Sequence, residues 1–363
     1  MAISTTVIPS SQPKLGILGE TTFGTLLDND GTDANNYRLL PQVTATKPTF
    51  NIFRESRLLS GRGTAKNAAD TVITNKNGTV TCPFDFLATP ELLLQHLAMV
   101  TNTYNADGSD VYTCEVDGTN NLSQVGGTIS SKEPHTVNLA YRPAASEGIV
   151  IPGTTVSDLS LSCDYASDGG HLRMSGNYFS GFPVTFASSG TGCLHEVNLT
   201  GTWAVPDEGT HINMGTLSTK QLEVDGANQD MILKSWNLNI ANGVTRVGSD
   251  SKGNAEAYAF PEYAVTGNVV VKYDGEFSMS TADNVVQSFL DGNTCGLALK
   301  FGDGTVSSAG EVNILAEVQY TGDPTQDMSE QGIFWNIPFE CVVNSSTEAL
   351  KISLFSDTAI GSM

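Results

Sequence analysis

A pattern of strand, long polar loop, returning strands and short helix occurs twice along the chain, and no other feature limits the possible folds as strongly. The first copy covers Lys47–Ala98 and the second covers Lys234–Asp291. Gly78 in a predicted turn of the first copy corresponds to Gly267 in the second. Because internal repeats can determine a whole architecture, they are considered before individual motifs. We infer a tandem duplication.

Each copy is predicted to end in a short helix. Thr89 is a suitable N-cap and Pro90 a suitable first helical residue, and three leucines then form an apolar face. These signals predict a helix over Pro90–Val100. The second helix is predicted near residues 282–291, after Thr281, at nearly the offset that separates the two glycines.

Alternation of apolar and polar residues, which is typical of half-buried strands, predicts the other elements. The predicted strands are Thr49–Phe53, Thr71–Thr74, Thr79–Phe86, Val111–Val116, Val137–Tyr141, Val156–Tyr165, Leu172–Phe179, Glu196–Trp203, Trp236–Ile240, Glu256–Phe260, Asn268–Tyr273, Cys295–Phe301, Glu311–Tyr320, Gly332–Val343 and Leu350–Phe355. Turns are predicted at Asn75–Gly78, Gly169–Gly170 and Thr266–Gly267, and a polar loop at Thr321–Glu330.

Composition favours an all-β protein. Glycine supplies 36 of the 363 residues, and only 16% of the residues are charged, as expected for sheets with many turns. The predicted fold class is all-β with short flanking helices, in two tandem repeats that are each a β-sandwich or barrel. The predicted segments are an N-terminal arm (1–46), a first repeat (47–180), a connecting segment (181–230) and a second repeat (231–363).

Charge and motif content disfavour several classes of protein. The formal net charge of −21 disfavours binding to free nucleic acid or to an anionic membrane. No apolar run approaches the roughly 20 residues that span a bilayer, and no secretory signal is expected. Six widely spaced cysteines favour reduced, buried thiols. Five scattered histidines and the lack of any catalytic motif predict no metal, no cofactor and no enzymatic activity.

Two predicted loops, Arg54–Asp70 and Gly243–Ala257, are far longer than the about two to five residues of an ordinary hairpin connection. The first is basic within an acidic chain, because its four cations face only two carboxylates, Glu55 and Asp70. The four cations are Arg54, Arg57, Arg62 and Lys66. We expect both loops to project from the body and to contact another copy of the chain, the basic loop by charge.

Several short motifs, taken in order, resemble the bacteriophage tail tube family, the major tail proteins of long-tailed phages. They are ETTFGT (Glu20–Thr25), YRLLP (Tyr37–Pro41), KPTF (Lys47–Phe50), SGRGT (Ser60–Thr64), the run Gly267–Phe301 and the C-terminal QGIFWNIPFECV. The resemblance implies two tail-tube-like repeats that assemble into stacked rings. Such rings form the conduit for genome DNA during ejection. The implied location is the virion tail, after assembly in the host cytoplasm, and the family has no catalytic residues.

Tail tubes built from single domains close as hexamers, so two such domains per chain imply a ring of three chains with pseudo-sixfold symmetry. A closed ring requires one repeating heterologous interface. The implied partners are other copies of the chain, other tail proteins at the tube ends, and DNA that passes without specific binding. No membrane partner is expected. A lumen lined with carboxylates would not hold a moving polyanion, whereas a basic lumen would.

Two other classes remain open on the sequence. A β-rich virion or cell-surface binding module, such as a decoration protein, fibre or adhesin, would share this composition without needing two matching copies. A hydrolase of cell-wall glycans could use a pair among the 39 acidic residues, although no motif singles one out. Imaging of purified protein separates the first class from a tube subunit, because a tube subunit forms rings or tubes.

Overall fold

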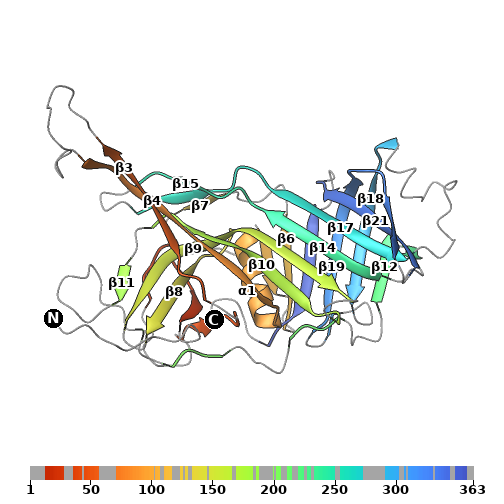
Figure 1. Cartoon of the computed structure of the whole chain (residues 1–363), viewed down its shortest axis with the longest axis horizontal. Coiled ribbons are helices and arrows are strands. Elements are labelled where there is room, and N and C mark those ends of the chain that lie inside the picture. Colours follow the sequence, from red (N-terminus) through yellow and green to blue (C-terminus); the bar gives the residue numbers. More distant parts are fainter. Residues whose placement is uncertain are drawn as a thin grey trace.

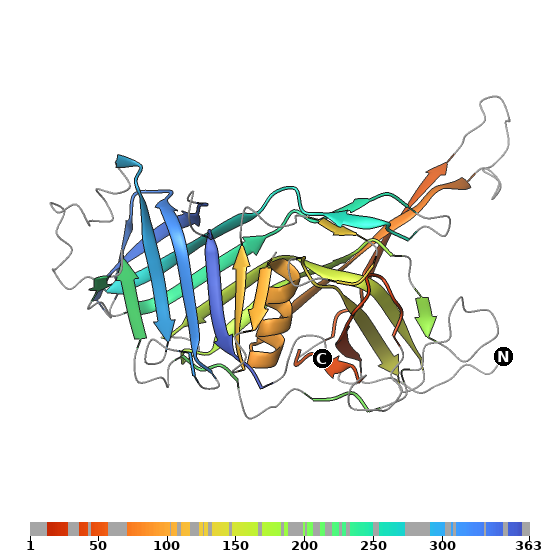
Figure 2. The same cartoon turned by 180° about the vertical axis from the view of Figure 1, so that it is seen from behind.

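Two β-layers enclose one hydrophobic core in the computed structural model of the chain (Figure 1), and Figure 2 shows them from behind. The structure describes residues 13–27, 36–42, 45–56, 71–101, 103–106, 110–116, 123–125, 127–129, 133–144, 147–165, 169–182, 185–187, 199, 202–205, 211–214, 220–224, 227–229, 233–249, 254–272, 291–301, 306–307, 310–329, 332–343 and 348–357. The backbone alone is described for residues 51–56, 71–78, 103–106, 123–125, 144, 147, 185–187, 220–222, 224, 227–229, 327 and 329. Strands predominate, which confirms the all-β class.

The front layer is an antiparallel sheet that contains strands from both halves of the chain. Its strands lie in the order β4, β10, β9, β14, β17, β21 and β20. They are β4 (Thr71–Leu87), β10 (Leu172–Ser180), β9 (Glu147–Asp164), β14 (Leu233–Ala241), β17 (Ala264–Lys272), β21 (Gly332–Cys341) and β20 (Thr325–Ser329). β3 (Thr49–Ser56) pairs with β4, and this ribbon leaves the body at one end (Figure 1). The pairing of β9 with β14 joins the two halves.

The back layer, which faces the viewer in Figure 2, combines a second antiparallel sheet with α1 (Pro90–Val100). Its strands lie in the order β13, β12, β18, β19, β22, β6 and β5. They are β13 (Ala227–Gln229), β12 (Lys220–Val224), β18 (Thr294–Phe301), β19 (Val312–Tyr320), β22 (Leu350–Phe355), β6 (Val111–Val116) and β5 (Thr103–Ala106). Because β6 comes from the first half and β22 from the second, this layer also crosses the predicted repeat boundary.

Two smaller sheets complete the fold at the end where the β3–β4 ribbon leaves. One contains the first part of β9 with β1 (Lys14–Gly19), β2 (Arg38–Leu39), β8 (Val137–Ala144) and β11 (Thr185–Ala187). The other contains β7 (Ser123–Val125), β15 (Thr245–Val247) and β16 (Ala257–Ala259). β9 belongs to two sheets, because it pairs with β8 as far as Thr154 and with β10 from Thr155 onward.

The helix α1 forms where its sequence signals predict it. The Thr89 side chain accepts a hydrogen bond from the backbone N–H of Leu92 at 3.3 Å, and Pro90 occupies the first turn. All of its residues except Glu91 are buried, although the sequence predicts one apolar face. The helix is buried this completely because it packs on β9 of the front sheet and also contacts β6 and β22 within its own layer.

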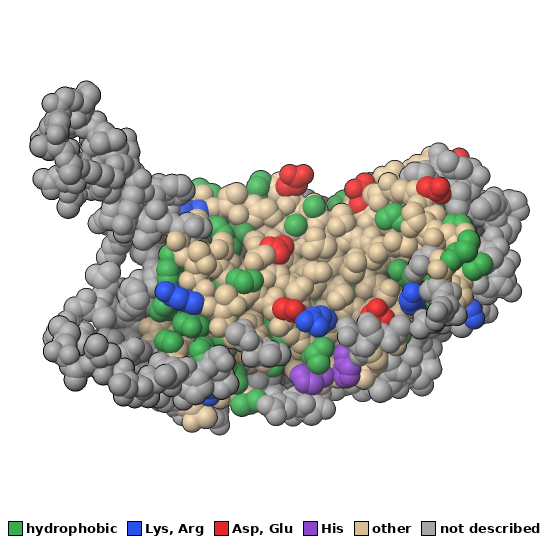
Figure 3. Space-filling model, viewed as in Figure 1, with side chains coloured by type: hydrophobic (Ala, Val, Ile, Leu, Met, Phe, Trp, Pro, Cys, Tyr) green, Lys and Arg blue, Asp and Glu red, His purple; other side chains and the backbone are tan. Residues whose placement is uncertain are grey.

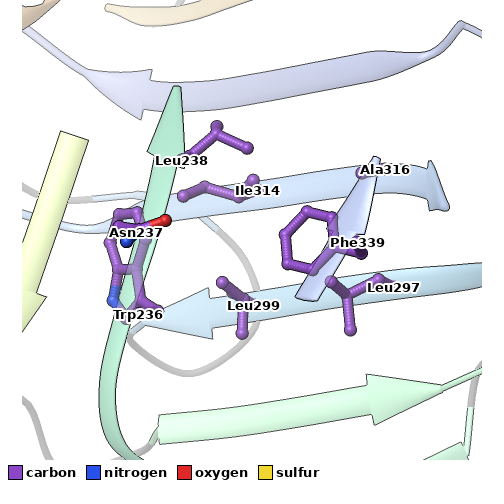
Figure 4. A pocket seen from close by; sticks show the side chains of 8 residues that line it. All are labelled: Trp236, Asn237, Leu238, Leu297, Leu299, Ile314, Ala316 and Phe339. Carbon is purple, nitrogen blue, oxygen red and sulfur yellow. The ribbon is translucent and has the colours of Figure 1, made fainter. Parts of the chain in front are cut away.

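The core lies between the layers and continues through both halves. Two glycines in the front sheet make room for it, because a Cβ on Gly176 would lie 2.9 Å from the Phe84 ring and one on Gly267 would lie 2.6 Å from the Phe339 ring. In both cases the phenylalanine is the direct cross-strand partner of the glycine. A void of about 10 Å³ remains in the second half, among side chains that include Leu299 (Figure 4).

Two predicted turns are wrong. Asn75–Gly78 lies inside β4, so the two strands predicted around it are one continuous strand. Thr266–Gly267 lies inside β17, which begins at Ala264, and the strand predicted at Glu256–Phe260 is the separate strand β16. In β4 the register shifts, because Thr79 pairs with Asn51 whereas Asn75 pairs with Phe53. The extra residues form a bulge, which accepts glycine as readily as a turn does. The turn at Gly169–Gly170 is confirmed by positive φ at both glycines.

Three other predictions are corrected. Part of the predicted arm forms β1, which pairs with β2 and β8 and places Leu15 and Ile17 in the core. The predicted polar loop after β19 contains β20. Of the predicted strand Glu196–Trp203, the described residues are not in a strand, although Trp203 and Leu199 are buried against β1 and β8 residues.

The loop predicted at Gly243–Ala257 does not project in its described part. It forms β15, which pairs with β16, and Tyr258 and Ala255 are buried against Phe23 and Phe182. Residues 250–253 lie outside the described residues. So does the second predicted helix, except for its last residue, Asp291, which is helical.

Candidate functional surface

The outer face of the front sheet carries rows of small polar side chains that run across six strands. In register order, one row is Asp85, Ser175, Ser160, Asn239, Thr266 and Glu340. The next row is Leu87, Arg173, Ser162, Asn237, Asn268 and Pro338. Alternate residues of the same strands point into the core, for example Leu161, Leu238 and Val269. One face therefore stabilises the fold, and the other is available to solvent.

The two central strands of this face have nearly identical patterns. β9 carries Ser160 and Ser162 outward between buried leucines, and its partner β14 carries Asn237 and Asn239 outward in the same way. Strict alternation in the sequence predicted strands here, but it did not reveal that the polar residues of separate strands would form shared rows. The only available signal was the repeated choice of Ser and Asn rather than Lys and Glu at the exposed positions.

Charged groups on this face are few. Among the side chains that the structure describes, they are Asp85, Asp158, Asp164, Arg173, Lys234, Lys272 and Glu340. Arg173 donates to both carboxylate oxygens of Asp85 at 2.7 Å, and this bond lowers the pKa of Asp85. Asp158 accepts hydrogen bonds from the Asn177 amide at 3.0 and 3.2 Å and from the Ser157 hydroxyl at 2.8 Å. The face is therefore close to neutral, with a small acidic excess.

The surface view shows the same character. Figure 3 shows a broad area of uncharged polar side chains and backbone over the front sheet, with isolated acidic and basic groups. A surface of this kind offers no cluster of cations to bind a polyanion and no large apolar patch to bind a protein.

Each side of the front sheet has an edge segment that lacks a partner strand within the described residues, although β21 also pairs with β19 of the back layer at Phe339–Cys341. On one side, β4 from Cys82 to Leu87 pairs with β10 only. On the other side, β20 pairs with β21 only, and it carries the exposed side chain Met328. Unprotected edges with exposed apolar groups favour pairing with another chain.

Of the four predicted contact cations, one lies within the described residues, in the ribbon of β3 and β4 that leaves the body. Arg54 lies in β3, where the backbone alone is described. Arg57, Arg62 and Lys66 lie outside the described residues, in the segment that links β3 to β4. The strands that flank this segment leave the body (Figure 1), as the prediction of a projecting loop requires.

Two buried titratable groups, His96 and Glu20, are hydrogen-bonded inside the protein and do not belong to the outer face. His96 is fully buried, not on the helix surface, and its two ring nitrogens lie 2.6 Å from the Tyr178 hydroxyl and from the Leu92 carbonyl oxygen. Burial lowers its pKa to about 4. Glu20 is also buried, and its carboxylate accepts four hydrogen bonds, from Thr136, Asn138, Gly153 and Gly24.

The described cysteines confirm the prediction of free thiols. Cys82, Cys114, Cys163 and Cys295 are buried and Cys341 is half-buried, and none of the five forms a disulfide. Cys193 lies outside the described residues. Within the described ranges, no three His, Cys, Asp or Glu side chains form a group that could hold a metal ion, and His195 lies outside those ranges.

Comparison with known proteins gives no relative: no family model matches the chain, and no curated protein sequence matches it. In the parts of the chain that the structure describes, no helix has both the length and the apolar character to span a membrane.

Proposed function

We propose that the chain is the structural subunit of a bacteriophage tail tube, in which three copies form a pseudo-hexameric ring and stacked rings form the conduit for genome DNA. The observation that carries the proposal is the outer face of the front sheet. A conduit wall must let a polyanion slide without holding it, and neutral polar rows with a small acidic excess meet that requirement.

The strand pairing supports the duplication on which the trimer depends. In the first half, β3 pairs with β4, β4 with β10, and β10 with β9. In the second half, β14 pairs with β17, β17 with β21, and β21 with β19, in the same order. α1 follows β4, and the predicted helix near 282–291 follows β17.

The unpaired edges of the front sheet support the ring. A sheet that ends in β4 on one side and β20 on the other can continue into neighbouring copies, and such a head-to-tail contact closes into a ring when its rotation permits. Among the described residues, a monomer would leave these two edge segments without a partner strand. The alternative, a β-rich virion or cell-surface binding module, does not require the sheet to continue from one copy into the next.

The test is imaging and mass measurement of the purified full chain. Sedimentation should give a species of three 38.4-kDa chains or stacks of it, and negative-stain microscopy should show hollow rings or tubes. Rings of six chains would contradict the proposal that two repeats in each chain allow three chains to close a ring. A chain that remains monomeric at high concentration would favour the binding module instead.

A further inference from the structure

The outer face of the back sheet contains a concavity of about 310 Å³ that the conduit proposal does not use. Its floor is made of small and apolar residues, Gly296, Ala298 and the 37%-exposed Leu315. Its rim carries three carboxylates, Glu223, Glu317 and Glu348. We call these six residues the back groove.

The sheet register fixes the position of the groove. Glu223 of β12 pairs with Ala298 of β18, and Ala298 pairs with Leu315 of β19. Leu315 in turn pairs with Lys351 of β22, which lies at the edge of the groove. These residues point outward because their neighbours along the strands, such as Leu299 and Ile314, are buried in the core.

The groove has an excess of negative charge. Lys300 forms an ion pair with Glu223 at 2.7 Å, and Lys351 forms one with Glu115 at 3.0 Å. Four glutamates therefore share two lysines around the floor. An apolar floor with an acidic rim fits a segment that has apolar side chains between cations.

We propose that the back groove binds the basic segment between β3 and β4 of a second copy of this chain. That segment contains the run Arg57–Arg62, in which two leucines lie between two arginines. Its apolar pair suits the floor, and its guanidinium groups suit the carboxylates of the rim. The proposal rests on the proposed function, because it names a second contact between subunits, in addition to the edges of the front sheet.

The occupant comes from another copy because of the shape of the chain. The β3–β4 ribbon leaves the body at one end, whereas β12 and β18 lie at the other end (Figures 1 and 2). A ribbon at one end and a groove at the other give a heterologous contact, which can repeat from copy to copy.

The experiment uses charge reversal in the full chain. The groove variant carries Glu317→Lys and Glu348→Lys, the ribbon variant carries Arg57→Glu and Arg62→Glu, and a third variant carries all four changes. Light scattering measures the concentration at which association begins. Each double variant should raise that concentration on the order of tenfold or more. In the combined variant, the concentration should return most of the way to the wild-type value.

A matched control and a contact readout complete the experiment. Glu262→Lys with Asp323→Lys makes the same change in net charge at exposed positions away from the groove, and should leave association unchanged. A zero-length carbodiimide cross-linker applied to mixed isotope-labelled and unlabelled wild-type chains should join Lys66 of one copy to Glu317 or Glu348 of another.

Normal association by the groove variant, or an absence of these cross-links from assembled wild-type protein, would overturn the inference and leave the tube proposal intact. The cross-links in assemblies that are not hollow would support the inference and overturn the tube proposal. A wild-type chain that never associates would overturn both.

Discussion

The buried carboxylate of Glu20 should make the stability of the chain depend on pH near neutrality. Burial raises its pKa from the ordinary 4.5 to about 7, although hydrogen bonds from Thr136, Gly153 and Gly24 oppose the rise. The folded chain then binds the proton more tightly than the unfolded chain does. The folded state therefore incurs no penalty below about pH 4.5, and it loses stability as the pH rises through 7.

The magnitude follows from the two pKa values. Between pH 5 and pH 8 the linkage relation gives a loss of about 2.5 kcal/mol in the free energy of unfolding. Glu20→Gln removes the titration and keeps the shape of the side chain. The NH2 that replaces one carboxylate oxygen cannot accept a hydrogen bond, so one backbone donor, the N–H of Gly24 or of Gly153, loses its acceptor, which adds a cost that does not vary with pH. The difference between wild type and variant should therefore shift by about 2.5 kcal/mol in favour of the variant.

Urea unfolding of both proteins at several pH values, in dilute unassembled solution, measures this difference. His135, whose pKa is lowered to about 4 by burial, also gains protons when the chain unfolds at mildly acidic pH. Tyr258 and Arg246 lie near Glu20 and interact with each other. These groups are common to both proteins, so their contributions cancel. A difference that stays constant from pH 5 to pH 8 would refute the reasoning, because it would mean that the four donors keep Glu20 ionised throughout.

Three further results are expected. Gly176→Ala should destabilise the fold by about 2 kcal/mol or more in urea titrations, because its Cβ would meet the Asp158 carbonyl oxygen, whereas Ser160→Ala on the outer face of the neighbouring strand should be nearly neutral. Leu299→Ala should cost about 3–5 kcal/mol by the same measurement, because it enlarges a void that the core already contains. Ser160→Lys with Asn239→Lys should leave tubes intact in micrographs but slow the release of DNA from particles, because it places cations on the proposed conduit wall.

Local pattern was sufficient for the elements whose signals are local. β6 and β22 have the predicted bounds, and the hairpin of β9 and β10 forms around the predicted glycine turn. The cap at Thr89 predicted the start of α1, because capping depends on residues three positions apart.

The errors in the prediction have two sources. Some residues fit more than one backbone geometry, and some strands pair with strands that are far away in the sequence. Gly78 and Gly267 suit turns, bulges and close aromatic contacts alike, so the sequence could not choose among them. The pairing of β9 with β14 and of β6 with β22 depends on long-range packing, which no window of residues contains. The polar rows and the back groove both arise from such pairings, so neither could be predicted from single strands.

The pairing of β9 with β14 also limits how the molecule can deform. Seven residue pairs in unbroken register join the two halves, and the core continues beneath them. Pairs of this kind also hold each half together, so the described strands join the two halves as one continuous sheet. In the proposed tube, the curvature would therefore be taken up between chains, while the described strands of each chain behave as one stiff plate.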